Sequence, residues 1–312
     1  MKFTRRAAFA TLSVTTLALA TACGSGGGSG GSAGAGMTIG LSVSTLNNPY
    51  FVQLKEGAEA AAKELGVTLV VQDAQNKSDA QVDQVQTFTT QGVKAIIINP
   101  VDSDQALPAS KAAEKAKIPL IAVDRVIKGG TVASEVASDN VQGGALAAVE
   151  LARAAPNSNV VQLQGVPGTS ASRDRGTGFE QGMNSGSIKV VAKQPADFDR
   201  AKGLDVMNNL LQAHPDVKGV FAENDEMALG AIKALGDKAG KDVAVVGFDG
   251  EPDGLKAVQD GTMAATVAQQ PKELGRKAVE QAVHAAKGES VQKVIDVEVK
   301  VVTKKNVAEF LK

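Results

Sequence analysis

The sequence predicts an α/β protein of two similar lobes, each built on a parallel sheet. Strand-like apolar runs alternate with segments of helical spacing through residues 37–312. The apolar runs are continuous rather than alternating with polar residues, which is typical of parallel strands that are covered on both faces. The two halves also echo each other, because Lys94 precedes the strand end at Asp124 by about the same distance as Lys218 precedes Asp249.

The first half of the chain contains the strands and helices that this fold requires. The strand that starts at Met37 breaks at Ser44, and Asn47-Asn48-Pro49 forces a turn before a helix over residues 50–65, which Gly66 stops. We expect further strands at 67–72, 95–98 and 118–123, with helices at 79–91 and 104–115 between them. The rhythm breaks at residues 137–140, and a helix at 141–154 follows.

A second cycle of the same kind fills the rest of the chain. Strands are expected at residues 160–163, 188–192, 217–222 and 243–246. The run 264–269 leads into a last helix at 271–287 and then into one final strand at 294–302. Similar units in a similar order predict two lobes of one architecture.

Residues 1–22 have the pattern of an export signal. A basic start precedes an apolar run, residues 7–20, that is too short to span a bilayer permanently. The run ends in small residues before Cys23, the chain's only cysteine, which resembles the lipobox of bacterial lipoproteins, where this cysteine carries the lipid. Sec export is favoured over the twin-arginine route, which Arg5-Arg6 would allow, because Phe9 lies one place late for that motif. After Cys23, residues up to 36 are almost all Gly, Ser and Ala, and they predict a flexible tether of on the order of 20 Å.

The composition excludes several classes of protein. The body of residues 37–312 is long for one domain and suits two. Because the chain has a single cysteine, disulfides contribute nothing inside the body, and a net charge of −1 argues against nucleic acid as a partner. No apolar run after the signal approaches membrane-spanning length.

Motifs for phosphate, acyl-transfer and metal chemistry are incomplete. Residues 165–170 lack the Gly-Lys-Ser/Thr of a phosphate loop, and residues 168–172 lack the last glycine of a nucleophile elbow. The acidic stretch 249–260 contains Pro252 and has no glutamate at its twelfth position, which argues against calcium. The two histidines, His214 and His284, are expected on the surface. We therefore expect no enzyme activity, no cofactor and no metal.

Polar and aromatic side chains gather at the predicted strand ends, where ligands bind in open α/β sheets. Four of the chain's ten aromatic residues lie there, and there is no tryptophan. Flat rings beside the apolar face of a sugar, with charged groups that each bond two neighbouring hydroxyls, are how proteins hold a polyol. The candidate ligand-binding residues are Ser44, Asn48, Tyr50, Phe51, Asp124, Arg125, Arg175, Phe198, Asn224, Phe248, Asp249 and Gln269.

Eight segments of the body resemble the ribose-binding branch of the galactose- and ribose-type periplasmic binding family, which serves bacterial ABC importers. The segments are VSTLNNPYF (43–51), INPVDSD (98–104), ASDN (137–140), GTSASRDRG (168–176), QPADFDR (194–200), NDEMALG (224–230), VGFDG (246–250) and AATVAQ (264–269). The resemblance covers nearly all of the chain after the tether. It departs at Tyr50, where phenylalanine is usual in this branch.

This resemblance implies two Rossmann-like lobes joined by three crossing segments that close over one ribopyranose. The lobes would be residues 37–138 with 270–298, and residues 139–269 with 299–312. Position by position, the twelve candidate residues would be the ribose contacts, and Ser44 belongs to them only by its place at a strand end. The implied protein is a monomer that delivers D-ribose to a membrane permease, with a chemoreceptor as a candidate further partner, and the lipobox adds an anchor on the outer face of the cell membrane.

Three alternatives stay open from the sequence. The sugar-sensing core of a lactose-repressor-type regulator shares this fold but would need a DNA-binding helix-turn-helix in front of it. A sugar-processing enzyme would need a catalytic set that these residues do not supply. The third alternative keeps the class and changes the ligand to allose, another pentose or a furanose signalling molecule, and only Tyr50 bears on that choice.

Overall fold

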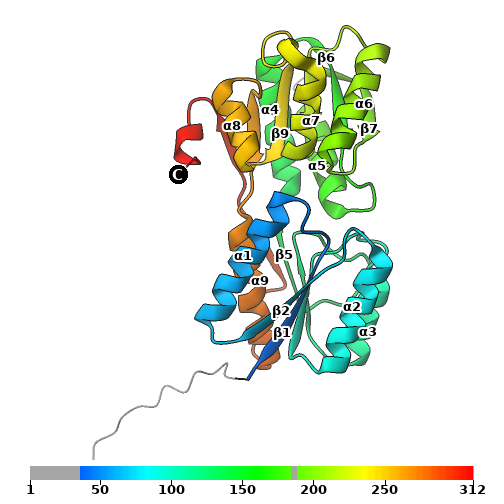
Figure 1. The fold of residues 1–312 in the computed structure, drawn as a ribbon, viewed down its shortest axis with the longest axis vertical. Helices are drawn as coiled ribbons and strands as arrows, with labels where there is room; N and C mark the ends of the chain where they lie inside the picture. The colour runs from blue at the N-terminus through cyan, green and yellow to red at the C-terminus, as the bar shows by residue number, and fades with distance from the viewer. Residues whose placement is uncertain (1–35, 184–187, 312) are drawn as a thin grey trace, which may run out of the picture. The chain divides into compact units, whose positions relative to one another are not determined.

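The computed structural model describes residues 36–183 and 188–311 (Figure 1). These residues contain two six-stranded sheets, each covered by helices on both faces. The expected signal segment, Cys23 and nearly all of the tether lie outside the described residues. No helix among the described residues is long and apolar enough to cross a membrane.

The first sheet has the strand order β11-β5-β4-β3-β1-β2, and all of its neighbouring strands are parallel. The strands are β1 (Thr38–Val43), β2 (Thr68–Asp73), β3 (Ala95–Ile98), β4 (Leu120–Val123), β5 (Ser134–Ser138) and β11 (Val294–Val297). On one face pack α1 (Pro49–Glu64) and α9 (Pro271–Ala286), and on the other pack α2 (Ser78–Gln91) and α3 (Leu107–Lys115).

The second sheet has the order β12-β10-β9-β8-β6-β7 and is parallel except for β12, which runs antiparallel to β10. Its strands are β6 (Ser158–Gln164), β7 (Ile188–Pro195), β8 (Gly219–Ala222), β9 (Ala244–Asp249), β10 (Ala265–Ala268) and β12 (Lys300–Thr303). One face carries α4 (Asn140–Ala154) and α5 (Ser170–Gly182), and the other carries α6 (Arg200–Ala213), α7 (Asp225–Leu235) and α8 (Pro252–Asp260). Single turns of 3-10 helix lie at Gly236–Lys238 and Val307–Glu309.

Continuous apolar strands form because each face of each sheet has its own core. In β3, Ala95 and Ile97 join the core under α1 and α9, whereas Ile96 and Ile98 join the core under α2 and α3. Full burial of one such isoleucine stabilises the fold by about 1.5–3 kcal/mol. Because successive side chains of a strand point to opposite faces of the sheet, a continuous apolar strand places apolar side chains in both cores, as the sequence predicted.

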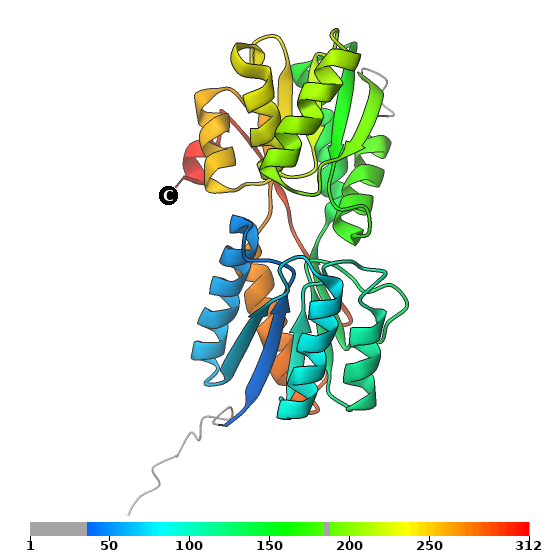
Figure 2. The same cartoon turned by 45° about the vertical axis from the view of Figure 1, so that its right-hand side comes forward.

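Three short segments carry the chain between the lobes, and they lie side by side (Figure 2). They connect β5 to α4, β10 to α9, and β11 to β12. The Asp139 amide donates to the carbonyl of Val297 at 3.3 Å, and Gln270 Nε2 donates to the carbonyl of Glu298 at 2.9 Å. The predicted fold class, two parallel α/β lobes joined by three crossing segments, is confirmed.

Two details of the predicted elements are wrong. The break expected at residues 137–140 overlaps the end of a further strand, β5. The buried face of β5 carries Ser134 and Ser138 beside Val136, and these small polar side chains conceal the apolar pattern of a strand. The single final strand expected at 294–302 is two strands, β11 and β12, which pair in different sheets. Local hydropathy cannot show that the chain changes partner within this run.

Candidate ligand-binding site

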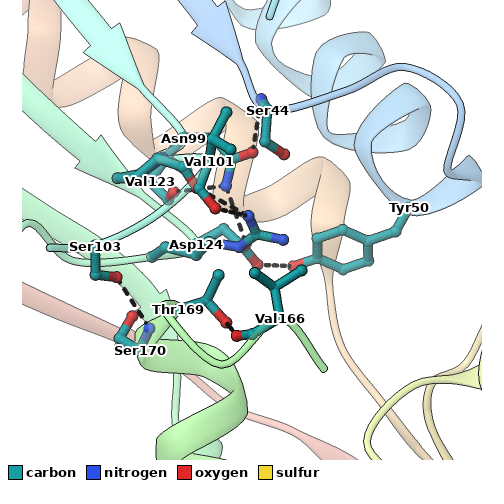
Figure 3. A network of polar contacts seen from close by, with 12 residues as sticks. Ser44, Tyr50, Asn99, Val101, Ser103, Val123, Asp124, Val166, Thr169 and Ser170 are labelled. Carbon is teal, nitrogen blue, oxygen red and sulfur yellow. Dashed lines mark hydrogen bonds and ion pairs between the residues drawn. The ribbon is translucent and has the colours of Figure 1, made fainter. Parts of the chain in front are cut away.

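The ends of three neighbouring strands fix one carboxylate, that of Asp124. Asp124 follows β4, is buried, and has a left-handed backbone with φ 67°. Asn99, after β3, donates from Nδ2 to Asp124 Oδ2 at 3.0 Å and accepts on Oδ1 from the Ser44 amide at 3.1 Å, after β1 (Figure 3). These bonds hold the carboxylate at the carboxyl edge of the first sheet.

Arg125 places a cation beside this carboxylate. Its Nη1 donates to the carbonyl of Pro100 at 2.8 Å, and its Nε lies 3.5 Å from Asp124 Oδ2. The guanidinium carbon lies 5.2 Å from the centre of the Phe51 ring and 5.6 Å from that of Phe198. Burial lowers the pKa of Arg125, and the charge of Asp124 opposes that shift. The group is thus a buried donor between two aromatic rings.

Arg175, on α5, is the matching cation of the second lobe. Its Nε donates to Asn140 Oδ1 at 2.9 Å, and its Nη1 donates to the carbonyl of Glu223 at 2.6 Å and to Asp249 Oδ1 at 3.3 Å. The guanidinium lies over the Phe248 ring, 3.8 Å from the ring centre. The first two bonds and the ring contact hold the guanidinium flat, with its remaining edge available to a ligand.

Glu223 holds Arg175 through its backbone carbonyl, and a separate hydrogen-bond network forms around its carboxylate. It is fully buried and accepts hydrogen bonds from Gln162 Nε2, the Gly165 amide and Ser172 Oγ at 2.7, 2.7 and 2.5 Å. Burial raises the pKa of Glu223, and these hydrogen bonds oppose the shift. Because Ser172 lies on α5, this network ties the helix that carries Arg175 to the ends of β6 and β8.

A chain of hydrogen bonds joins the two lobes through Tyr50. The Tyr50 hydroxyl donates to Asp124 Oδ1 at 2.8 Å and also lies 3.0 Å from Gln269 Oε1. Gln269, just beyond β10, donates from Nε2 to Asp249 Oδ1 at 2.6 Å. Arg175 contacts the same oxygen of Asp249. Polar groups from both sheets therefore meet at one place.

Two asparagines, Asn48 and Asn224, cap helices and also lie where the polar groups of the two lobes meet. Asn48 caps α1 by accepting the Tyr50 amide on Oδ1 at 2.7 Å, and Asn224 caps α7 by accepting the Met227 amide at 3.0 Å. A capping asparagine uses its oxygen, so its Nδ2 stays available as a donor. Asn224 Nδ2 makes only a long contact, 3.5 Å, to the carbonyl of Phe198.

These groups line a small, partly open cavity of about 20 Å³. Its lining contains Ala171 and ten of the twelve predicted residues, namely Asn48, Tyr50, Phe51, Asp124, Arg125, Arg175, Phe198, Asn224, Asp249 and Gln269. The other two lie behind the lining: the Ser44 hydroxyl is buried without a hydrogen-bond partner among the described residues, and the Phe248 ring lies under Arg175. Ten of the candidate residues thus line the cavity, and the other two, Ser44 and Phe248, contact residues that line or position it.

The candidate list omitted several residues that build the site. Ala171 lines the cavity, and Asn99, Asn140 and Glu223 position the charged groups. Asn99 and Glu223 follow strands, so the strand-end rule that selected Asp124 could have found them. Ala171 carried no chemical signal, because a methyl group at a helix start is ordinary.

Charge in the cavity is balanced and suits a neutral ligand. Two carboxylates, Asp124 and Asp249, face two guanidiniums, Arg125 and Arg175. Burial raises the pKa of Asp249, and Arg175 opposes that shift. Among residues 36–183 and 188–311, no group of three or more His, Cys, Asp or Glu side chains is placed to hold a metal ion. The site offers paired donors, paired acceptors and flat rings.

Comparison with known proteins places the chain in a family. The profile of the periplasmic binding protein domain matches residues 39–290. The ribose import binding protein of Escherichia coli is 53% identical over 268 residues, which are 86% of this chain and 90% of the relative. The one of Bacillus subtilis is 49% identical, over 86% of this chain and 88% of its own length.

A solved structure shows the same fold. The ABC transporter periplasmic solute binding protein of Actinobacillus succinogenes, with bound D-allose, superposes with a TM-score of 0.82 at 35% identity, over 88% of this chain and 99% of its own. The chain therefore belongs to the periplasmic binding protein family. Members of this family are solute-binding proteins.

Proposed function

We propose that this chain is the extracytoplasmic binding component of an ABC sugar importer and that its ligand is D-ribose. One lobe comprises residues 37–138 and 270–298, and the other comprises residues 139–269 and 299–312. The twelve candidate residues hold or support the sugar between them. Lipid on Cys23 anchors the protein to the outer face of the cell membrane.

The observation that carries this proposal is the convergence of polar and aromatic groups from both lobes on one cavity. Asp124 and Arg125 come from the first lobe, and Arg175 and Asp249 come from the second. A guanidinium or carboxylate can bond two adjacent hydroxyls, and such charge-assisted bonds are about twice as strong as neutral ones. Phe51 and Phe198 line the same space with apolar rings, which suit the C–H groups of a sugar.

Binding would close the lobes because each lobe supplies only part of the hydrogen bonds. A sugar in the open form would contact one set of charged groups, and closure would complete the second set. The ligand therefore stabilises the closed form by its differential contacts. The membrane permease would recognise that form, and the proposed carrier acts as a monomer without nucleic acid; a chemoreceptor is a further partner of the same surface.

Relatives with other ligands define the alternative within this class. The structure from Actinobacillus succinogenes holds D-allose, and D-allopyranose is ribopyranose with one added hydroxymethyl group. Identity near 50% to the ribose import binding proteins favours ribose over allose.

Calorimetric titration of residues 37–312 tests the proposal. D-ribose, D-allose, L-arabinose, D-xylose and D-galactose would be titrated separately. Tight one-to-one binding of ribose, with the other sugars bound at least about tenfold more weakly, is expected. Binding of allose in preference to ribose would replace the ligand and keep the class, and binding of no sugar would refute the sugar-carrier function.

A further inference from the structure

The phenol of Tyr50 occupies a position that a ligand hydroxyl could use. Tyr50 lies in the first turn of α1, is 3% exposed, and packs edge-on against Phe51 with ring centres 5.2 Å apart. Its hydroxyl lies between two buried acceptors, Asp124 Oδ1 at 2.8 Å and Gln269 Oε1 at 3.0 Å. Both acceptors belong to residues that line the cavity.

This hydroxyl completes a polar chain that would otherwise be interrupted. On one side Asp124 is fixed by Asn99, and on the other side Gln269 donates to Asp249, which Arg175 contacts. If a phenylalanine ring stood at position 50, two buried oxygens would face each other without a donor between them. Buried acceptors left unpaired cost about 1–3 kcal/mol each, so they would demand a donor from the ligand.

The phenol supplies a donor at this point from within the protein, and its single proton is shared between the two oxygens. Burial and the neighbouring Asp124 raise the pKa of Tyr50, so the hydroxyl keeps its proton and can donate. A ligand hydroxyl directed at the same two oxygens must compete with a donor that is already in place.

We propose that Tyr50 determines sugar specificity, because its hydroxyl takes the place of one sugar hydroxyl between Asp124 and Gln269. The native site then accepts a pentose that lacks or inverts that one hydroxyl more readily than a phenylalanine site does. This inference rests on the proposed sugar-binding function and names Tyr50 as the residue that relaxes the selectivity of the site.

The test compares native protein with Tyr50→Phe on a panel of sugars. D-arabinose, D-xylose and L-lyxose each invert a single hydroxyl of D-ribose, and 2-deoxy-D-ribose lacks one. For each protein, the Kd of every analogue is divided by the Kd of ribose. We expect this ratio to rise about tenfold in Tyr50→Phe for the analogues altered at one position, and to stay within about twofold for the others.

A matched variant controls for loss of a buried hydroxyl. Ser110→Ala removes a hydroxyl of α3 that donates to the carbonyl of Thr131 at 2.9 Å, away from the cavity, and should leave every ratio unchanged. A uniform change of all Kd values in Tyr50→Phe, or unchanged ratios, would overturn the inference while leaving the sugar-carrier function intact. If native protein binds none of the sugars, the proposed function itself fails.

Tyr50→Leu provides a second measurement, because it removes the ring together with the hydroxyl. The same single position should become sensitive in this variant, on top of a general loss of affinity from the missing ring. If no position stands out in either variant, the hydroxyl does not select the ligand.

Discussion

Replacement of Arg175 by alanine is the most direct test of the site. The guanidinium is 3% exposed and is held by Asn140 and by the carbonyl of Glu223, with the Phe248 ring beneath it. Among the described residues, its Nη2 makes no hydrogen bond to the protein. We therefore expect Nη2, with part of Nη1, to serve the ligand.

The size of the effect follows from the kind of bond that is lost. A hydrogen bond from a buried charged donor contributes about 1.5–3 kcal/mol, and Arg175→Ala removes up to two such bonds to the sugar. It also leaves Asp249 without its nearest cation. Allowing for water that enters the space, we expect a loss of about 2–4 kcal/mol, which raises the Kd for ribose about 30- to 1,000-fold.

Titration calorimetry and thermal melting of the same samples check this expectation. Arg175→Lys keeps the charge without the two-pronged donor, so its Kd should fall between those of native protein and Arg175→Ala. Arg153→Ala removes an exposed arginine that pairs with Glu150 on α4, and it should bind like native protein. An Arg175→Ala protein that melts normally and binds ribose within about threefold of native would remove Arg175 from the site.

Three further variants test the anchor, the packing behind the site and its buried acids. Cys23→Ser should move the protein from the membrane fraction to the soluble fraction of cells; retention in the membrane would contradict the lipobox assignment. Gly144→Ala should lower the melting temperature, because its Cβ would lie 2.1 Å from the carbonyl oxygen of Arg175, and overpacking costs about 1–3 kcal/mol. Its control is Gly176→Ala on α5, where the nearest atoms would lie at 3.4 Å and no loss is expected. Glu251→Gln should raise the melting temperature at about pH 8 by about 5 °C and leave it nearly unchanged at about pH 5.

Much of the site was predictable because topology makes it so. Parallel strands end at one edge of a sheet, and residues that follow them must meet there. Asp124 and Asp249 follow β4 and β9, and both reach the cavity. That rule needs only the strand ends, which the apolar runs mark clearly.

The interactions among those residues could not be predicted in the same way. The bond of Tyr50 to Gln269 joins residues that are far apart in sequence and depends on how the two lobes meet. The support of Arg175 by Glu223 depends on a carbonyl that no sequence pattern marks. Likewise, the division of residues 294–302 into β11 and β12 depends on which sheet offers a free edge. Local periodicity contains none of this information.

Buried acids behind the site are another feature that the sequence concealed. Glu251 belongs to the acidic stretch considered above for calcium, yet it is 2% exposed and its carboxylate oxygens have no hydrogen-bond partner among the described residues. Asp225 is fully buried and accepts from Thr266 Oγ1 at 2.7 Å and from the Glu251 amide at 2.9 Å. Burial raises the pKa of Asp225 from its ordinary value of 3.8 to about 8, and burial, with Asp249 and Asp225 nearby, raises that of Glu251 as well.

The sign of the pH dependence follows from these shifts. An acid whose pKa is higher in the folded than in the unfolded state binds its proton more tightly when folded, so it favours folding at low pH. For Asp225 that contribution is complete below about pH 4 and is lost as the pH rises through about 8; Glu251 acts in the same direction. Glutamine cannot ionise, so Glu251→Gln removes the part of the stability loss at high pH that comes from Glu251. The control Glu114→Gln changes an exposed side chain and should leave the melting temperature at about pH 8 unchanged. A native melting temperature that rises between about pH 5 and pH 8, or a Glu251→Gln protein that melts no higher than native at about pH 8, would show that this carboxyl is not held protonated in the fold.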